Sequence, residues 1–66
     1  MKGTVARIMM DKGFGFIKAP DGKEYFFHRS SMAATDSFDA VSLGDSVDFE
    51  ATDTPKGPRA EAVYRD

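Results

Sequence analysis

Short runs of alternating apolar and polar residues occupy most of the chain, and glycine or proline bounds most of them. Alternation predicts half-buried β-strands, because successive side chains of a strand project to opposite faces. We expect five strands, at residues 2–10, 13–18, 23–28, 46–50 and 60–64. The alternation slips near the middle of the first run, which is typical of a β-bulge.

Turn-forming sequences separate these runs and predict how the strands are connected. Residues 20–22 (Pro-Asp-Gly) join the second and third strands as a hairpin, and residues 54–58 form another turn. Residues 35–45 read as a long connection, and residues 30–34 allow at most one helical turn. Five short strands with one long crossover favour a small closed all-β barrel, because closure removes the unpaired edges of an open sheet.

Four of the six phenylalanines and the only histidine lie in the second and third expected strands. Residues two apart in a strand share a face, so Phe14 and Phe16 project together, as do Phe26 and His28. One interpretation places these rings in the core, where large aromatic side chains usually lie. The alternative is that they form an exposed surface, here called the aromatic face (Phe14, Phe16, Phe26 and His28).

Other residues favour the exposed arrangement. Lys18 and His28 continue the same face and prefer water, and Gly15 suits the tight inner side of a curved strand. A sufficient core is available on the opposite faces of the strands, from Val5, Ile17, Tyr25, Phe27, Val47, Phe49 and Val63. An exposed aromatic patch on so small a domain marks a binding surface. Rings bordered by Lys12, Lys18 and Lys23 suit single-stranded nucleic acid, whose bases stack while its phosphates meet ammonium groups.

Two segments, Lys12-Gly13-Phe14-Gly15-Phe16-Ile17 and Tyr25-Phe26-Phe27-His28, resemble the two ribonucleoprotein motifs of the cold-shock domain. The resemblance extends from Gly3 to Tyr64. It implies a five-stranded antiparallel OB-fold barrel, with residues 1–66 as a single cold-shock domain that binds single-stranded RNA and DNA. Members of that family act as RNA chaperones and transcription antiterminators. By position, the resemblance implies nucleic-acid contacts at Lys12, Phe14, Phe16, Phe26, His28, Phe38 and Lys56.

The chain departs from the family pattern at Arg7 and Arg29. Many members have Lys-Trp-Phe where this chain has Ala6-Arg7-Ile8, and phenylalanine where it has Arg29; the chain contains no tryptophan. A guanidinium group can stack on a base and also bind a phosphate. We therefore include Arg7 and Arg29 as nucleic-acid contacts that depend more on electrostatic attraction than on stacking. The alternative is that both side chains are simply solvated.

Composition limits the remaining possibilities. The net charge is −2, but residues 1–31 are net positive and residues 32–66 net negative, so the basic half coincides with the aromatic face. The chain has no cysteine, which excludes disulfides and thiolate zinc sites. No apolar run approaches the roughly 20 residues of a membrane-spanning helix. With no room for a signal peptide before the first strand, we expect a cytoplasmic protein that does not contact membranes.

Catalytic and metal-binding patterns are lacking in the sequence. His28 has serines nearby at positions 30 and 31 but no carboxylate spaced to orient it, and residues 36–48 lack calcium-loop spacing. We expect no enzyme activity, no cofactor, no metal and no small-molecule substrate. A monomer is expected, with residues 35–45 as a hinge should a strand-exchanged dimer form. The alternative function is a protein-interaction barrel with weakened nucleic-acid binding, which the acidic net charge and missing tryptophan favour and the aromatic face opposes.

Overall fold

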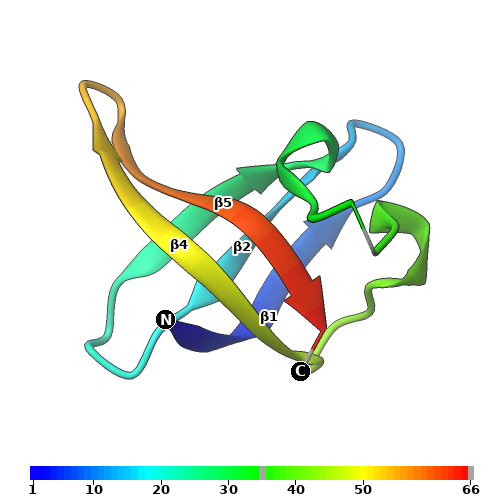
Figure 1. Ribbon diagram of the computed structural model, residues 1–66, viewed down its shortest axis with the longest axis horizontal. Helices are drawn as coiled ribbons and strands as arrows, with labels where there is room; N and C mark the ends of the chain where they lie inside the picture. The colour runs from blue at the N-terminus through cyan, green and yellow to red at the C-terminus, as the bar shows by residue number, and fades with distance from the viewer. Residues whose placement is uncertain (35, 66) are drawn as a thin grey trace.

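A computed structural model of the chain describes residues 1–34 and 36–65. Its strands are β1 (Lys2–Met9), β2 (Phe14–Lys18), β3 (Glu24–His28), β4 (Ser46–Thr54) and β5 (Gly57–Arg65), with single 3₁₀ turns at η1 (Arg29–Ser31) and η2 (Phe38–Ala40) (Figure 1). The strands close into a barrel in the order β1-β2-β3-β5-β4. The predicted five-stranded all-β barrel is therefore confirmed. Thr35, the first residue of the expected connection, and Asp66 lie outside the described residues.

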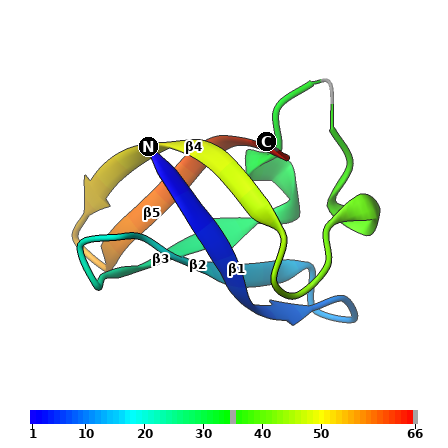
Figure 2. The same ribbon diagram turned by 90° about the horizontal axis from the view of Figure 1, so that it is seen from below.

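The connecting segments gather at the two ends of the barrel. Figure 2 shows η1 and η2 at one end, and the hairpin between β4 and β5 at the other. The hairpin strands are longer than the alternation predicted, since β4 continues to Thr54 and β5 starts at Gly57. None of the residues in this extension is buried, so it carries no alternation of buried and exposed residues that would have marked it as strand.

Pairing around the barrel is antiparallel except where β3 meets β5. The β1–β2, β2–β3, β1–β4 and β4–β5 ladders are antiparallel, whereas β3 and β5 pair in parallel at Phe26 and Arg59. The parallel ladder follows from the crossover after β3, which carries the chain to β4 so that the β4–β5 hairpin returns along β3 in the same direction. The expected antiparallel pairing thus holds for every ladder except this closing one.

A β-bulge at Ala6 reorients the second half of β1. Val5 lies opposite Ile17, whereas Arg7 lies opposite Phe16, so β1 has one residue more than β2 in this interval. Val5 is consequently buried, while Arg7 is exposed on the outside of the barrel although only two residues separate them. This bulge is the predicted slip in the alternation.

A second irregularity, which the sequence did not predict, lies in β5. The β4–β5 register shifts between Asp48 and Glu50, and Ala62 in the shifted part of β5 has a φ of 51°. A positive φ is uncommon for a residue other than glycine. The extra residue bends β5, which must curve to contact both β3 and β4.

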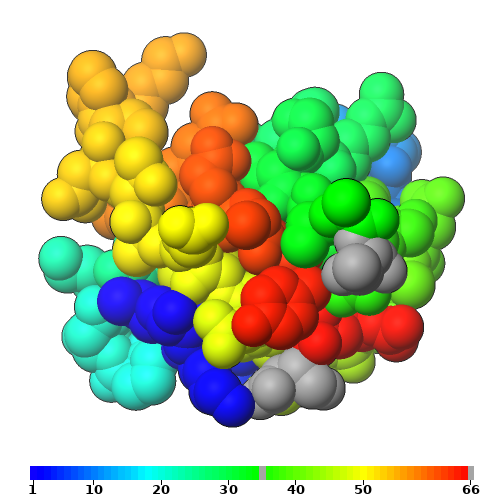
Figure 3. Space-filling view, viewed as in Figure 1, coloured from blue at the N-terminus to red at the C-terminus, as the bar shows by residue number. Residues whose placement is uncertain are grey.

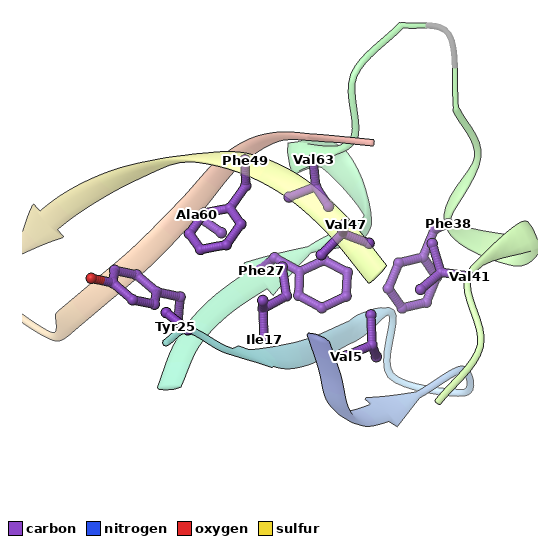
Figure 4. Close-up of a cluster of buried hydrophobic side chains, with 11 residues drawn as sticks. Val5, Ile17, Tyr25, Phe27, Phe38, Val41, Val47, Phe49, Ala60 and Val63 are labelled. Atoms are coloured by element: carbon purple, nitrogen blue, oxygen red, sulfur yellow. The ribbon is translucent and has the colours of Figure 1, made fainter. Parts of the chain in front are cut away.

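The barrel encloses a core of aliphatic and aromatic side chains (Figure 4). Phe27 and Phe49 are its largest fully buried members. The Tyr25 ring packs 5.2 Å from that of Phe49, measured between centroids. All seven residues predicted to form the core are buried: Val5, Ile17, Tyr25, Phe27, Val47, Phe49 and Val63. Burial of each large apolar side chain contributes roughly 1.5–3 kcal/mol, which such a small domain requires.

Phe38 belongs to this core, contrary to the expectation that it contacts nucleic acid. Its side chain is only 6% exposed, and its ring centroid lies 5.7 Å from that of Phe27. The η2 turn places Phe38 over the end of the barrel, where Val41 is buried beside it in the same cluster. In this conformation the ring offers no free face to a base, so Phe38 is not part of the interface described below.

Candidate nucleic-acid interface

The rings of the aromatic face lie together on the outside of β2 and β3. Phe14 is paired with His28 and Phe16 with Phe26, which places these four side chains on one face of the hairpin. The ring centroids are 5.5 Å apart for Phe14 and Phe26, and 5.8 Å apart for Phe16 and Phe26. All four side chains are half-buried, whereas the alternate residues Ile17, Tyr25 and Phe27 are buried. The predicted division between core and surface is confirmed.

Close approach of β1 and β2 at Gly15 holds this face in place. A Cβ atom at Gly15 would lie 2.6 Å from the backbone oxygen of Arg7 and 2.9 Å from Cε1 of Phe27. Only glycine fits between these two atoms, as expected for the inner side of a curved strand. Phe14 and Phe16, on either side of Gly15, therefore project outward from a strand that is fixed against its neighbours.

Strand register extends the aromatic face into two rows of side chains across the barrel. One row runs Arg7–Phe16–Phe26–Arg59 over β1, β2, β3 and β5, and the other runs Met9–Phe14–His28 over β1, β2 and β3. Arg7, which the sequence analysis included as a candidate contact, thus lies beside Phe16. Sequence reasoning did not assign Arg59 or Met9 to the site. The parallel β3–β5 ladder that positions Arg59 joins residues 33 positions apart, and the chain offers no local signal for it.

His28 is held in one tautomer by the residue two positions later. The backbone N–H of Ser30 donates to Nδ1 of His28 at 3.2 Å, and Oγ of Ser30 lies 3.0 Å from the same nitrogen. Because Nδ1 accepts the backbone hydrogen bond, the proton of the neutral ring is on Nε2. His28 can therefore present both a flat ring and an N–H donor to a ligand.

Arg29 and Lys12 border the aromatic face at the end of the barrel that carries the β1–β2 turn. The backbone N–H of Arg29 donates to the carbonyl of Gly13 at 2.8 Å. A Cβ atom at Gly13 would lie 3.1 Å from Cδ of Arg29, so the aliphatic part of Arg29 lies over this glycine, next to Phe14. Both Arg29 and Lys12 are exposed, and each can bring positive charge to a nucleic-acid strand that crosses Phe14 and His28.

Lys56 comes to the other end of the face through the β4–β5 hairpin, which projects from the body of the barrel in Figure 3. A hollow of about 410 Å³ lies between this hairpin and the rings of Phe16 and Phe26, and Lys56, Pro58 and Arg59 line it. The turn is stabilised by a hydrogen bond of 2.8 Å from Oγ1 of Thr54 to the carbonyl of Gly57. Lys56 is thus adjacent to rings that lie far from it in the sequence.

Within residues 1–34 and 36–65, no group of three or more His, Asp or Glu side chains could hold a metal ion. None of the helical segments in that part is long and apolar enough to cross a bilayer.

A closed five-stranded barrel with half-buried rings and basic side chains on its β2–β3 face has the architecture of OB-fold proteins, which bind oligonucleotides on the corresponding face. Residues 1–65 match the family described as the 'Cold-shock' DNA-binding domain. The chain belongs to this cold-shock domain family and is a nucleic-acid-binding protein.

Relatives of similar length support this assignment. The chain is 39% identical over 63 residues to cold shock-like protein CspLB of Listeria monocytogenes, covering 96% of this chain and 94% of the relative. It is 35% identical over 65 residues to cold shock-like protein CspC of Bacillus cereus, covering 98% of each. It is 40% identical over 63 residues to cold shock-like protein CspE of Buchnera aphidicola, covering 96% of this chain and 91% of the relative.

Proposed function

We propose that this protein binds single-stranded RNA and DNA across the two rows of the aromatic face, and acts as an RNA chaperone or transcription antiterminator. The observation that carries this proposal is the half-exposed cluster of Phe14, Phe16 and Phe26, with centroids 5.5–6.1 Å apart, on the outside of the barrel. Each base stacked on such a ring contributes about 1–3 kcal/mol. The faces of bases in a duplex are covered by stacking on the neighbouring base pairs, so the surface selects unpaired strands.

Individual side chains have different roles in this proposal. Phe14, Phe16, Phe26 and the ring of His28 stack on bases, while Nε2 of His28 donates a hydrogen bond. The cations around them, Arg7, Lys12, Arg29 and Lys56, contact phosphates. Because the protein binds RNA only where the bases are unpaired, its binding shifts weak RNA hairpins toward the open form by mass action. This is the physical basis of chaperone or antiterminator activity.

The remaining features of the proposal follow from a binding surface of this kind. We infer that residues 1–66 work as one cold-shock domain, as a monomer in the cytoplasm. Stacking and phosphate contacts need no cofactor or metal ion and make or break no covalent bond, so we assign binding rather than catalysis. A dimer formed by strand exchange at the long connection before β4 would appear as a second species in sedimentation analysis.

Fluorescence anisotropy with a labelled, unstructured pyrimidine-rich oligonucleotide in low salt tests the proposal. We expect saturable binding, and much weaker binding of the same sequence as a blunt duplex. A molecular-beacon RNA hairpin should open as protein is added. Absence of oligonucleotide binding at millimolar affinity or better would overturn the proposal in favour of a protein-interaction barrel.

A further inference from the structure

Arg59 lies at the end of the row formed by Arg7, Phe16 and Phe26, on the strand that closes the barrel. It is paired with Phe26 and lines the hollow beside Phe16. Its neighbour Ala60 is fully buried, and adjacent side chains of a strand alternate, so Arg59 projects to the outer surface. A guanidinium group therefore lies next to the rings on which bases would stack.

Partners from the same side of the barrel hold the Arg59 guanidinium. Nη2 donates to Oγ of Ser31 at 3.4 Å, and Nε lies 3.4 Å from Oε2 of Glu61. Nε itself is buried and has no hydrogen-bond partner among the described residues. The contact with Glu61 is thus an ion pair without an aligned hydrogen bond, and it leaves a donor of Arg59 unsatisfied.

Such a contact is easily replaced. The side chains of Arg59 and Glu61 are 37% and 41% exposed, and ion pairs at this exposure are weak. A phosphate group accepts two parallel hydrogen bonds from a guanidinium, which a carboxylate at this distance without alignment does not match. A phosphate that arrives beside Phe26 can therefore displace the carboxylate of Glu61.

We propose that Arg59 is a further phosphate contact of the interface, and that Glu61 competes with the nucleic-acid backbone for its guanidinium group. This inference rests on the proposed function, because the phosphate arrives with a single strand whose bases stack on Phe16 and Phe26. Glu61 thus lowers the affinity of the protein for single strands through Arg59 in particular, rather than through net charge alone.

A double-mutant cycle tests the competition. The parent protein, Glu61→Gln, Arg59→Gln and the double variant are titrated with a fluorescein-labelled oligothymidylate of about ten nucleotides, within the site size of an OB-fold. We expect Glu61→Gln to tighten binding by up to about fivefold, the upper range for an exposed ion pair. Arg59→Gln should weaken binding and reduce the slope of log affinity against log salt by about 0.7. In the double variant, the gain from Glu61→Gln should disappear.

Glu50→Gln is the matched control for charge. Glu50 lies directly opposite Glu61 on β4, one strand farther from Phe26 in the barrel order, and its substitution makes the same change in net charge. We expect it to change affinity clearly less than Glu61→Gln does. Thermal melts of every variant establish that it is folded at the temperature of the titration.

Two results would overturn the competition between Glu61 and the ligand. One is an equal gain from Glu50→Gln and Glu61→Gln, and the other is a gain from Glu61→Gln that persists without Arg59. If Arg59→Gln does not fold, the comparison of the two glutamate variants still decides the question. A parent protein that fails to bind the oligonucleotide contradicts the proposed function, whereas normal parent binding with an unchanged Arg59→Gln variant contradicts this inference alone.

Discussion

Arg7 lies directly opposite Phe16 on the outer surface of the barrel, because the bulge at Ala6 shifts the register of β1 by one residue. Strict alternation from the buried Val5 would have directed Arg7 toward the core, where an unpaired guanidinium is not tolerated. The bulge therefore keeps a guanidinium group out of the core and places it beside Phe16. In this chain, the guanidinium group beside Phe16 lies at the position where the sequence departs from the resemblance described above.

Phe16→Ala should weaken binding of a single-stranded oligonucleotide by about 1–3 kcal/mol, the contribution of one base stack. The stability of the protein should change little, because the ring is half-exposed. Phe27→Ala, one of the fully buried rings, is the control and should cost about 3–5 kcal/mol of unfolding free energy. Anisotropy titrations and thermal melts of both variants separate the two effects. Lost stability with unchanged affinity for Phe16→Ala would place that ring in the core.

Salt should weaken binding strongly despite the net charge of −2. The candidate phosphate contacts predicted from the sequence are Arg7, Lys12, Lys18, Arg29 and Lys56. If roughly three to five of them are engaged, log affinity should fall with log salt at a slope of about −2 to −3.5, from about 0.7 per contact. Titrations over a series of potassium chloride concentrations measure the slope. A slope near zero would contradict the electrostatic half of the proposed interface.

Arg7→Trp should strengthen binding and reduce the salt slope by about 0.7, because a stacking ring replaces a phosphate contact beside Phe16. Arg65→Trp, an exposed position at the end of β5, controls for nonspecific effects of an added tryptophan. Quenching of the new tryptophan fluorescence by the oligonucleotide would report stacking directly. Unchanged or weaker binding would mean that Arg7 lies off the strand path or already stacks through its guanidinium group.

Phe38→Ala should destabilise the fold by about 3–5 kcal/mol, because its ring packs against Phe27 over the end of the barrel. A domain of this length has only about 3–10 kcal/mol of total stability, so much of the variant should be unfolded at 37 °C. At low temperature, the fraction that remains folded should bind oligonucleotides with nearly parental affinity. A stable variant with much reduced affinity would show that Phe38 leaves the core to contact the ligand.

Alkaline pH should destabilise the protein partly through Tyr25. Burial of the ring, together with the nearby Asp21 carboxylate that its hydroxyl contacts at 3.3 Å, raises the pKa of Tyr25 above its ordinary value of 10.0. Folding therefore favours the protonated phenol, and this contribution is complete below pH 10 and lost as pH rises through the raised pKa. Tyr25→Phe should flatten the decline in melting temperature above pH 10. Tyr64→Phe, at an exposed tyrosine, is the control, and identical profiles for the two variants would contradict the assignment.

Local pattern in the sequence was enough to predict the parts of the molecule that depend on neighbours along the chain. Period-two alternation identified β2 and β3 and divided Phe14, Phe16 and Phe26 from the buried Ile17 and Phe27. The slip in that alternation predicted a bulge near the middle of β1, and the structure places it at Ala6. These features could be predicted because strand geometry fixes which residues share a face. Lys18 and His28, which prefer water, then indicated which face is exposed.

Only the tertiary structure decided where distant segments meet. The crossover after β3 leads to β4, and the β4–β5 hairpin then brings β5 back alongside β3 in the same direction. This parallel pairing places Arg59 beside Phe26 and closes the barrel. The same closure carries Lys56 to the hollow beside Phe16, while η2 turns Phe38 inward onto Phe27. Such contacts depend on the packing of the whole barrel. An apolar ring such as Phe38 is buried where the closed barrel leaves a space for it, and the local spacing of residues cannot predict where that space lies.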